Sequence, residues 1–177
     1  AIVGPRADAS RIPGIDVEVG DGEEFRLGNA LARVFGVPGH TRGHIAYWFE
    51  GDKALFCGDT LVALGCGRLF EGTPQEMWKS LTSLRDLPGD TRVYCAHEYT
   101  QTNARFALTV EPDNEALKVI AERVEVRRAK GLPTVPSLMA DEQAANPFLR
   151  ADQDELQRAM GLENADPVGV FAEIRYR

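Results

Sequence analysis

The character of the sequence changes near residue 100, and this change limits the possible folds more than any other feature. Before it, short runs rich in β-branched and aromatic residues are separated by turn-forming residues, a pattern typical of β-strands. After it, apolar residues recur at the spacing of one helix face. The sequence therefore predicts an α+β protein, with strands and one helix in residues 1–99 and a small helical domain in residues 100–177.

Four runs in the first part are predicted strands. A turn at residues 50–52 lets the second and third run form a hairpin. The four runs cover residues 32–37, 44–49, 54–57 and 92–95.

One helix in the first part has clear signals at its start. Thr73 can cap it, Pro74 suits the first helical position, and Glu76 lies three residues after the cap, which completes a capping box. Met77 and Leu84 lie at helical spacing and are expected to face the core.

The helical domain is predicted to contain three helices. Asp113 is the expected cap of the first, which should stop at Gly131. The second should run over 152–160 and close at Gly161, and the third should begin at Asp166. We interpret their spaced apolar residues as packing surfaces.

Composition excludes several classes of protein. The chain has 177 residues and a net charge of -7, which argues against nucleic acid as a partner because such proteins usually present a basic surface. We find no apolar run of membrane-spanning length and no signal peptide. Three cysteines without C-x-x-C spacing favour a reducing cytoplasm over a disulfide framework. We therefore expect a cytoplasmic monomer.

The three histidines all lie where predicted strands meet loops. His40 and His44 belong to the segment PGHTRGH, and His97 follows the run at 92–95. Asp59 follows the run at 54–57. Imidazole and carboxylate are ligands that Zn²⁺ and similar ions prefer, so a metal site is one interpretation. The alternative is that each residue is an ordinary polar group with a local partner, and spacing alone does not give the number of metal ions.

These residues lie in motifs that resemble those of the hydroxyacylglutathione hydrolases, or glyoxalase II, within the metallo-β-lactamase superfamily. The PGHT element alone indicates only the superfamily, whereas GCGRLFEGT and HEYT narrow the resemblance to this branch. The shared elements are PGHTxGH at 38–44, GDTL at 58–61, GCGRLFEGT at 65–73, HEYT at 97–100 and NPFLR at 146–150.

The resemblance implies the C-terminal part of an αββα sandwich followed by a helical substrate-binding domain. It implies two divalent metal ions, zinc first and iron or manganese as alternatives, with His40 on one, His97 on the other and Asp59 bridging both. Asp59, with a metal-bridging hydroxide, would be catalytic. His44 would support the ligands without binding a metal.

The implied substrate is a glutathione thioester such as S-D-lactoylglutathione, hydrolysed during methylglyoxal detoxification. The residues that the resemblance places around glutathione are Arg68, Phe70, Tyr99, Asn103 and Arg175. Guanidinium groups suit this peptide because they form paired bonds to carboxylates. Phe70 stands where some family members have a tyrosine.

The family's Thr-His-x-His-x-Asp-His element has no counterpart here, because no histidine precedes His40. Two ligands for each ion fall short of the three usual for catalytic zinc. We therefore expect that an upstream part of the protein is absent and that this chain alone is inactive. Two alternatives remain: a glutathione persulfide dioxygenase of the same fold, and a non-catalytic fragment.

Overall fold

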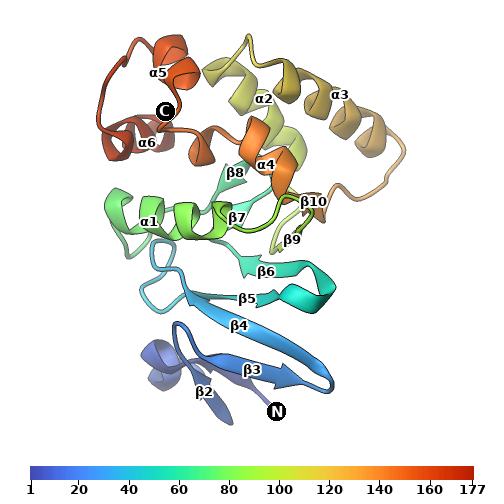
Figure 1. The fold of residues 1–177 in the computed structure, drawn as a ribbon, viewed down its shortest axis with the longest axis vertical. Helices are drawn as coiled ribbons and strands as arrows, with labels where there is room; N and C mark the ends of the chain where they lie inside the picture. Colours follow the sequence, from blue (N-terminus) through green and yellow to red (C-terminus); the bar gives the residue numbers. More distant parts are fainter.

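The computed structural model describes all residues, 1–177, and places a sheet at one end of the molecule and most helices at the other (Figure 1). The main sheet has six strands in the order β10-β9-β6-β5-β4-β3. Only the β6–β9 and β1–β2 pairs are parallel. The strands are β1 (Val3–Pro5), β2 (Val17–Val19), β3 (Glu24–Leu27), β4 (Ala30–Gly36), β5 (Ile45–Phe49), β6 (Ala54–Gly58), β7 (Leu61–Val62), β8 (Gly65–Cys66), β9 (Arg92–Cys95) and β10 (Ser137–Leu138).

Helix α1 crosses the middle of the molecule, and the later helices gather beyond it (Figure 1). Three short 3-10 helices complete the fold. The helices are α1 (Pro74–Arg85), α2 (Thr100–Val110), α3 (Glu115–Ala129), α4 (Met139–Ala145), α5 (Asp154–Met160) and α6 (Pro167–Tyr176), with 3-10 turns η1 (Arg6–Arg11), η2 (Glu50–Asp52) and η3 (Pro147–Leu149).

The four predicted strands are confirmed as β4, β5, β6 and β9. The predicted hairpin is β5–β6, whose antiparallel register pairs Tyr47 with Phe56. The remaining strands are two to four residues long and were not predicted, because runs of that length carry too little alternation to stand out.

The predicted capping box of α1 is confirmed. The Thr73 hydroxyl accepts from the Glu76 backbone N–H at 3.3 Å, and the Glu76 carboxylate accepts from the Thr73 N–H at 2.8 Å. Met77 and Leu84 are fully buried, as their spacing predicts.

The prediction for the cap of α3 was wrong by one residue. Asn114, not Asp113, is the cap, and its side-chain oxygen accepts from the Leu117 N–H at 3.0 Å. Asp and Asn are about equally favourable at the N-cap, so the residue type alone does not show which of these two neighbours is the cap. The stop of α5 at Gly161 is confirmed by its left-handed backbone, with φ of 69°. Helices α2 and α4 were not predicted.

Apolar packing joins the strand region to the helical region. One cluster of 19 buried residues spans the sheet, α1, η3 and α6, and includes Leu55, Leu81 and Phe171. A smaller cluster of 8 residues lies mainly between α2 and α3. The division at residues 99 and 100 into two domains stays a prediction.

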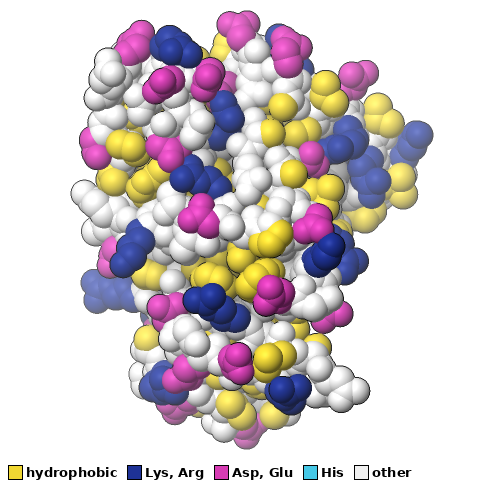
Figure 2. Space-filling view, in the orientation of Figure 1, with side chains coloured by type: hydrophobic (Ala, Val, Ile, Leu, Met, Phe, Trp, Pro, Cys, Tyr) yellow, Lys and Arg dark blue, Asp and Glu magenta, His cyan; other side chains and the backbone are white.

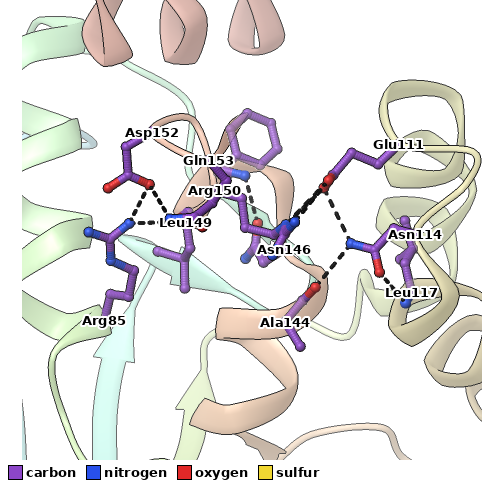
Figure 3. Close-up of polar contacts among 11 residues, drawn as sticks. Arg85, Glu111, Asn114, Leu117, Ala144, Asn146, Leu149, Arg150, Asp152 and Gln153 are labelled. Carbon is purple, nitrogen blue, oxygen red and sulfur yellow. Dashed lines mark hydrogen bonds and ion pairs between the residues drawn. The ribbon is translucent and has the colours of Figure 1, made fainter. Parts of the chain in front are cut away.

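A polar network ties the segments of the helical region together (Figure 3). Arg150 donates to both carboxylate oxygens of Glu111 at 3.0–3.3 Å, and both side chains are largely buried. Arg85 of α1 donates to the Leu149 carbonyl and to Asp152, each at 2.8 Å. The NPFLR motif is therefore anchored on both sides.

Lysines and arginines are interspersed with acidic side chains over the face shown in Figure 2, without a large area of one sign. All three cysteines are unpaired in the structure. None of the helices has the length and apolar character needed to cross a lipid bilayer. The monomeric state stays a prediction.

Candidate active site

The loops that follow β4, β6 and β9 bring His40, Asp59 and His97 together. Nε2 of His97 lies 3.1 Å from Oδ1 of Asp59, and Nε2 of His40 lies 3.8 Å from Oδ2 of the same carboxylate. Each oxygen of Asp59 thus faces a different imidazole. No three or more His, Cys, Asp and Glu side chains enclose a single common point.

The tautomer of His40 follows from its neighbour. Its Nδ1 lies 2.9 Å from the Arg68 carbonyl oxygen, which can only accept a hydrogen bond. Nδ1 therefore donates to this carbonyl, and in the neutral ring the lone pair is on Nε2, the nitrogen on the side of Asp59. Metal-binding histidines are commonly oriented by this kind of carbonyl contact.

His44 uses both ring nitrogens inside the protein. Nε2 accepts from the Asp59 backbone N–H at 3.3 Å, and Nδ1 lies 3.4 Å from the Thr60 hydroxyl, which donates to the Val37 carbonyl. Burial is the main cause that lowers the pKa of His44, with a smaller contribution from His40. A neutral imidazole with both nitrogens in hydrogen bonds holds the Asp59 backbone in place. Its one ring lone pair, on Nε2, is used by the Asp59 N–H and is not free for an ion.

Two glycines allow the site loops to approach closely. Gly58 has φ of 53°, and a Cβ there would lie 2.6 Å from the His44 ring. A Cβ at Gly67 would lie 2.0 Å from the Asp59 carbonyl oxygen. Both contacts are shorter than a Cβ atom tolerates, so a larger residue at Gly58 would displace the His44 ring and one at Gly67 would displace the Asp59 backbone.

A cleft of about 560 Å³ opens over these residues. Its volume is within the range of small-molecule sites. All the predicted metal-binding and substrate-binding residues line it, and of the predicted site residues only His44 does not. The predicted residues at its wall are His40, Asp59, Arg68, Phe70, His97, Tyr99, Asn103 and Arg175.

Aromatic stacking organises the walls of the cleft. Tyr99 stacks on His97 with ring centres 4.8 Å apart and planes 11° apart, and Phe70 lies 5.0 Å from the His40 ring. Phe70 is 66% exposed and Tyr99 is 55% exposed, so both rings offer apolar surface to a bound molecule. Arg175 reaches the cleft from α6, with its guanidinium 5.8 Å from the Phe148 ring centre.

Some residues near the site were not identified from the sequence. Glu98 lies between two cleft residues, but its carboxylate turns away and accepts from the Thr134 N–H at 2.8 Å, which anchors the loop that carries His97. Thr102 lines the cleft from α2. Its position was not predictable because Tyr99, the residue before the first turn of α2, makes no side-chain capping hydrogen bond.

Comparisons with known proteins agree with this arrangement. Residues 3–97 match the family described as "Metallo-beta-lactamase superfamily", and residues 98–177 match "Hydroxyacylglutathione hydrolase C-terminus". Hydroxyacylglutathione hydrolases from Methylococcus capsulatus and Maricaulis maris are 61% and 57% identical over 176 residues. Each alignment covers 99% of this chain and 69% of the relative.

Solved structures share the fold at lower sequence identity. The crystal structure of ETHE1 from Myxococcus xanthus has a TM-score of 0.60 and 23% identity, covering 98% of this chain and 65% of that one. The BLEG-1 B3 metallo-beta-lactamase has a TM-score of 0.56 and 19% identity, covering 83% of this chain and 64% of that one. The predicted fold class is confirmed, and with the identities above the chain belongs to the hydroxyacylglutathione hydrolase family of thioester hydrolases.

Proposed function

We propose that this chain contributes the active-site cleft of an enzyme that hydrolyses S-D-lactoylglutathione and related 2-hydroxyacylglutathione thioesters. The observation that carries the proposal is Asp59, whose two oxygens each face an imidazole Nε2 in a cleft that Arg68 and Arg175 also line. This combination joins a metal-type donor set to a binding site for a carboxylate-bearing molecule.

The donor types, imidazole and carboxylate, fit the divalent metal ions that membership of the superfamily implies, and this chain offers each ion two of them. We assign His40 and Asp59 to one ion and Asp59 and His97 to a second, with zinc as the first choice and iron or manganese as alternatives. A carboxylate with one imidazole at each oxygen suits two adjacent ions. Bound ions would lower the pKa of a water molecule and polarise the thioester carbonyl.

The residues of the cleft bind and orient the substrate in this scheme. Arg68 and Arg175 pair with the carboxylates of the glutathione moiety, and Asn103 and the Tyr99 hydroxyl offer hydrogen bonds. The exposed Phe70 ring covers the apolar part of the thioester. His44 keeps the Asp59 backbone in place through its 3.3 Å contact.

The reaction exchanges a carbon–sulfur bond for a carbon–oxygen bond. A water oxygen adds to the thioester carbonyl, the carbon–sulfur bond breaks, and the sulfur leaves with its electron pair as glutathione thiolate. The acyl group leaves as the 2-hydroxy acid, and the water protons are released to solvent or to the thiolate. The residues of this chain hold the reactants in line and lower the entropy cost of their encounter.

The experiment measures two activities of the full-length gene product. We expect release of glutathione thiol from S-D-lactoylglutathione and no oxygen consumption with glutathione persulfide. Oxygen consumption with persulfide in the absence of thioester hydrolysis would instead indicate the dioxygenase of the same fold. Absence of both activities in metal-loaded protein would favour a non-catalytic role.

A further inference from the structure

The short hairpin β7–β8 connects Asp59 to Arg68 in the metal-type site, that is, His40, Asp59 and His97 with the cleft around them. Its first strand begins two residues after Asp59, and its second strand ends two residues before Arg68. At the turn, Leu64 has φ of 57°, in the left-handed region that a branched side chain rarely adopts. Such a conformation persists only when the surroundings fix it.

Side chains from the helical region fix this turn. One carboxylate oxygen of Glu142 accepts from the Leu64 N–H at 2.9 Å and from the Asn146 side-chain amide at 2.9 Å. The same amide donates to the Gly65 carbonyl at 3.0 Å, and the Asn103 amide donates to the Ala63 carbonyl at 3.0 Å. Glu142 and Asn146 are 1% and 0% exposed, so water does not compete for these bonds.

Hydrogen bonds of the backbone link the hairpin to residues of the cleft. The Gly67 N–H donates to the Thr60 carbonyl at 3.3 Å, which links the two ends of the hairpin. Arg68 follows Gly67 in the sequence, and its carbonyl oxygen accepts a hydrogen bond from Nδ1 of His40 at 2.9 Å. A displaced turn would therefore move the group that orients His40 and the backbone that carries the Arg68 side chain.

Keeping Glu142 at this place costs stability. Burial raises the pKa of its carboxyl to about 7, and hydrogen bonding by Ser137 and Asn146 lowers it by a smaller amount. An apolar side chain would avoid this cost. The hydrogen bonds that the carboxyl accepts from the Leu64 N–H and from Asn146 offset part of this cost.

We propose that Glu142 and Asn146 are positioning residues that hold the β7–β8 turn in its left-handed conformation and thereby orient His40 and Arg68 for metal and substrate binding. The inference rests on the proposed function and extends it to the NPFLR motif, whose first residue is Asn146. In this proposal the helical region lines the cleft and also fixes the positions of His40 and Arg68 through the β7–β8 turn.

The test compares four variants of the full-length gene product. Glu142→Ala and Asn146→Ala remove the contacts to the turn, and Glu142→Gln keeps an acceptor of the same shape. Glu122→Ala, at an exposed carboxylate of α3, is the control. The readouts are zinc affinity by competition with a chromophoric chelator, kcat and KM for the thioester, and the unfolding midpoint.

We expect Glu142→Ala and Asn146→Ala to lose about 10–100-fold in zinc affinity and in kcat at temperatures where they remain folded. Glu142→Gln should stay within about threefold of the wild type, and Glu122→Ala should match it. Wild-type zinc affinity in a folded Glu142→Ala protein would overturn the proposal. If that variant does not fold, the milder Glu142→Asp decides, because its shorter side chain should still weaken zinc binding.

The two proposals can fail separately. A wild-type protein that binds zinc without hydrolysing the thioester would contradict the proposed function, while the zinc affinities of the variants would still test the positioning role. Active wild-type protein with unchanged variants would contradict only the positioning role.

Discussion

The cleft and the helical region both contain polar clusters, and they differ in where their side chains find partners. In the helical region, Arg150 and Glu111 meet through both carboxylate oxygens and are 16% and 4% exposed at their side chains (Figure 3). In the cleft, the His97 side chain is 46% exposed, and its Nε2 faces one oxygen of Asp59. Polar groups paired inside the chain hold the fold, whereas polar groups directed at a cleft remain available for a ligand.

The largest expected effect on stability comes from the paired cluster. Glu111→Ala leaves the Arg150 guanidinium buried without its partner, which should cost about 3–5 kcal/mol of unfolding free energy. Urea unfolding measures this cost, and kcat per folded molecule should not change. The control is Glu115→Ala at an exposed ion pair with Lys118, expected within about 0.5 kcal/mol of the wild type. A loss below about 1 kcal/mol for Glu111→Ala would show that the pair does not hold the fold.

The next effect concerns the buried carboxyl of Glu142. Its pKa is raised from 4.5 to about 7 in the folded protein, so the unfolded chain ionises first as pH rises. The contribution of Glu142 to the unfolding free energy is therefore fully present below about pH 4.5. It declines by up to about 3 kcal/mol as the pH rises to about 7. Asp141 of the same helix, itself paired with Arg123, raises this pKa further, and Ser137 and Asn146 lower it.

Unfolding of the wild type and Glu142→Gln between pH 4.5 and pH 8 measures this contribution. The difference in stability between the two proteins should shift by about 3 kcal/mol in favour of the glutamine variant as pH rises. A constant difference across this window would show that Glu142 titrates near its ordinary pKa.

A smaller effect is expected for substrate binding in the cleft. Arg68→Ala should raise KM for the thioester about 10–100-fold, the loss expected for a charged hydrogen bond, with a smaller change in kcat. Arg26→Ala on β3, outside the cleft lining, is the control and should leave both constants unchanged. An equal fall in kcat at constant KM would assign Arg68 to the chemical step.

The smallest effect separates two neighbouring residues at the start of α3. Asn114→Ala should lose about 1 kcal/mol because its side chain caps the Leu117 N–H, whereas Asp113→Ala should lose less than about 0.5 kcal/mol. Thermal unfolding of both variants measures the difference. A larger loss for Asp113→Ala than for Asn114→Ala would show that Asp113 caps the helix.

The sequence predicted the strand-end loops well because their residues depend on local chemistry. His40, Asp59 and His97 each follow a strand whose apolar run is visible in the sequence, and a rigid sheet then brings these loops to one edge. The motifs also contain Arg68 and Tyr99, which line the same cleft, and their role in substrate binding stays a prediction.

The parts that escaped prediction depend on contacts between distant residues. Glu142 lies 78 residues from its partner Leu64, and nothing in its own segment indicates that a carboxyl there is buried. Helix α4, which carries it, has seven residues and lacks a side-chain cap. Short elements whose stability comes from packing leave weak local signals.

The most direct test of the account compares metal content and turnover in the full-length gene product and its Asp59→Ala variant. We predict two divalent ions per wild-type molecule, loss of at least one ion in the variant, and a fall in turnover of at least about 100-fold in variant protein that remains folded by circular dichroism. A folded Asp59→Ala protein that keeps both ions and full turnover would contradict the assignment of Asp59 as the carboxylate shared by two metal sites.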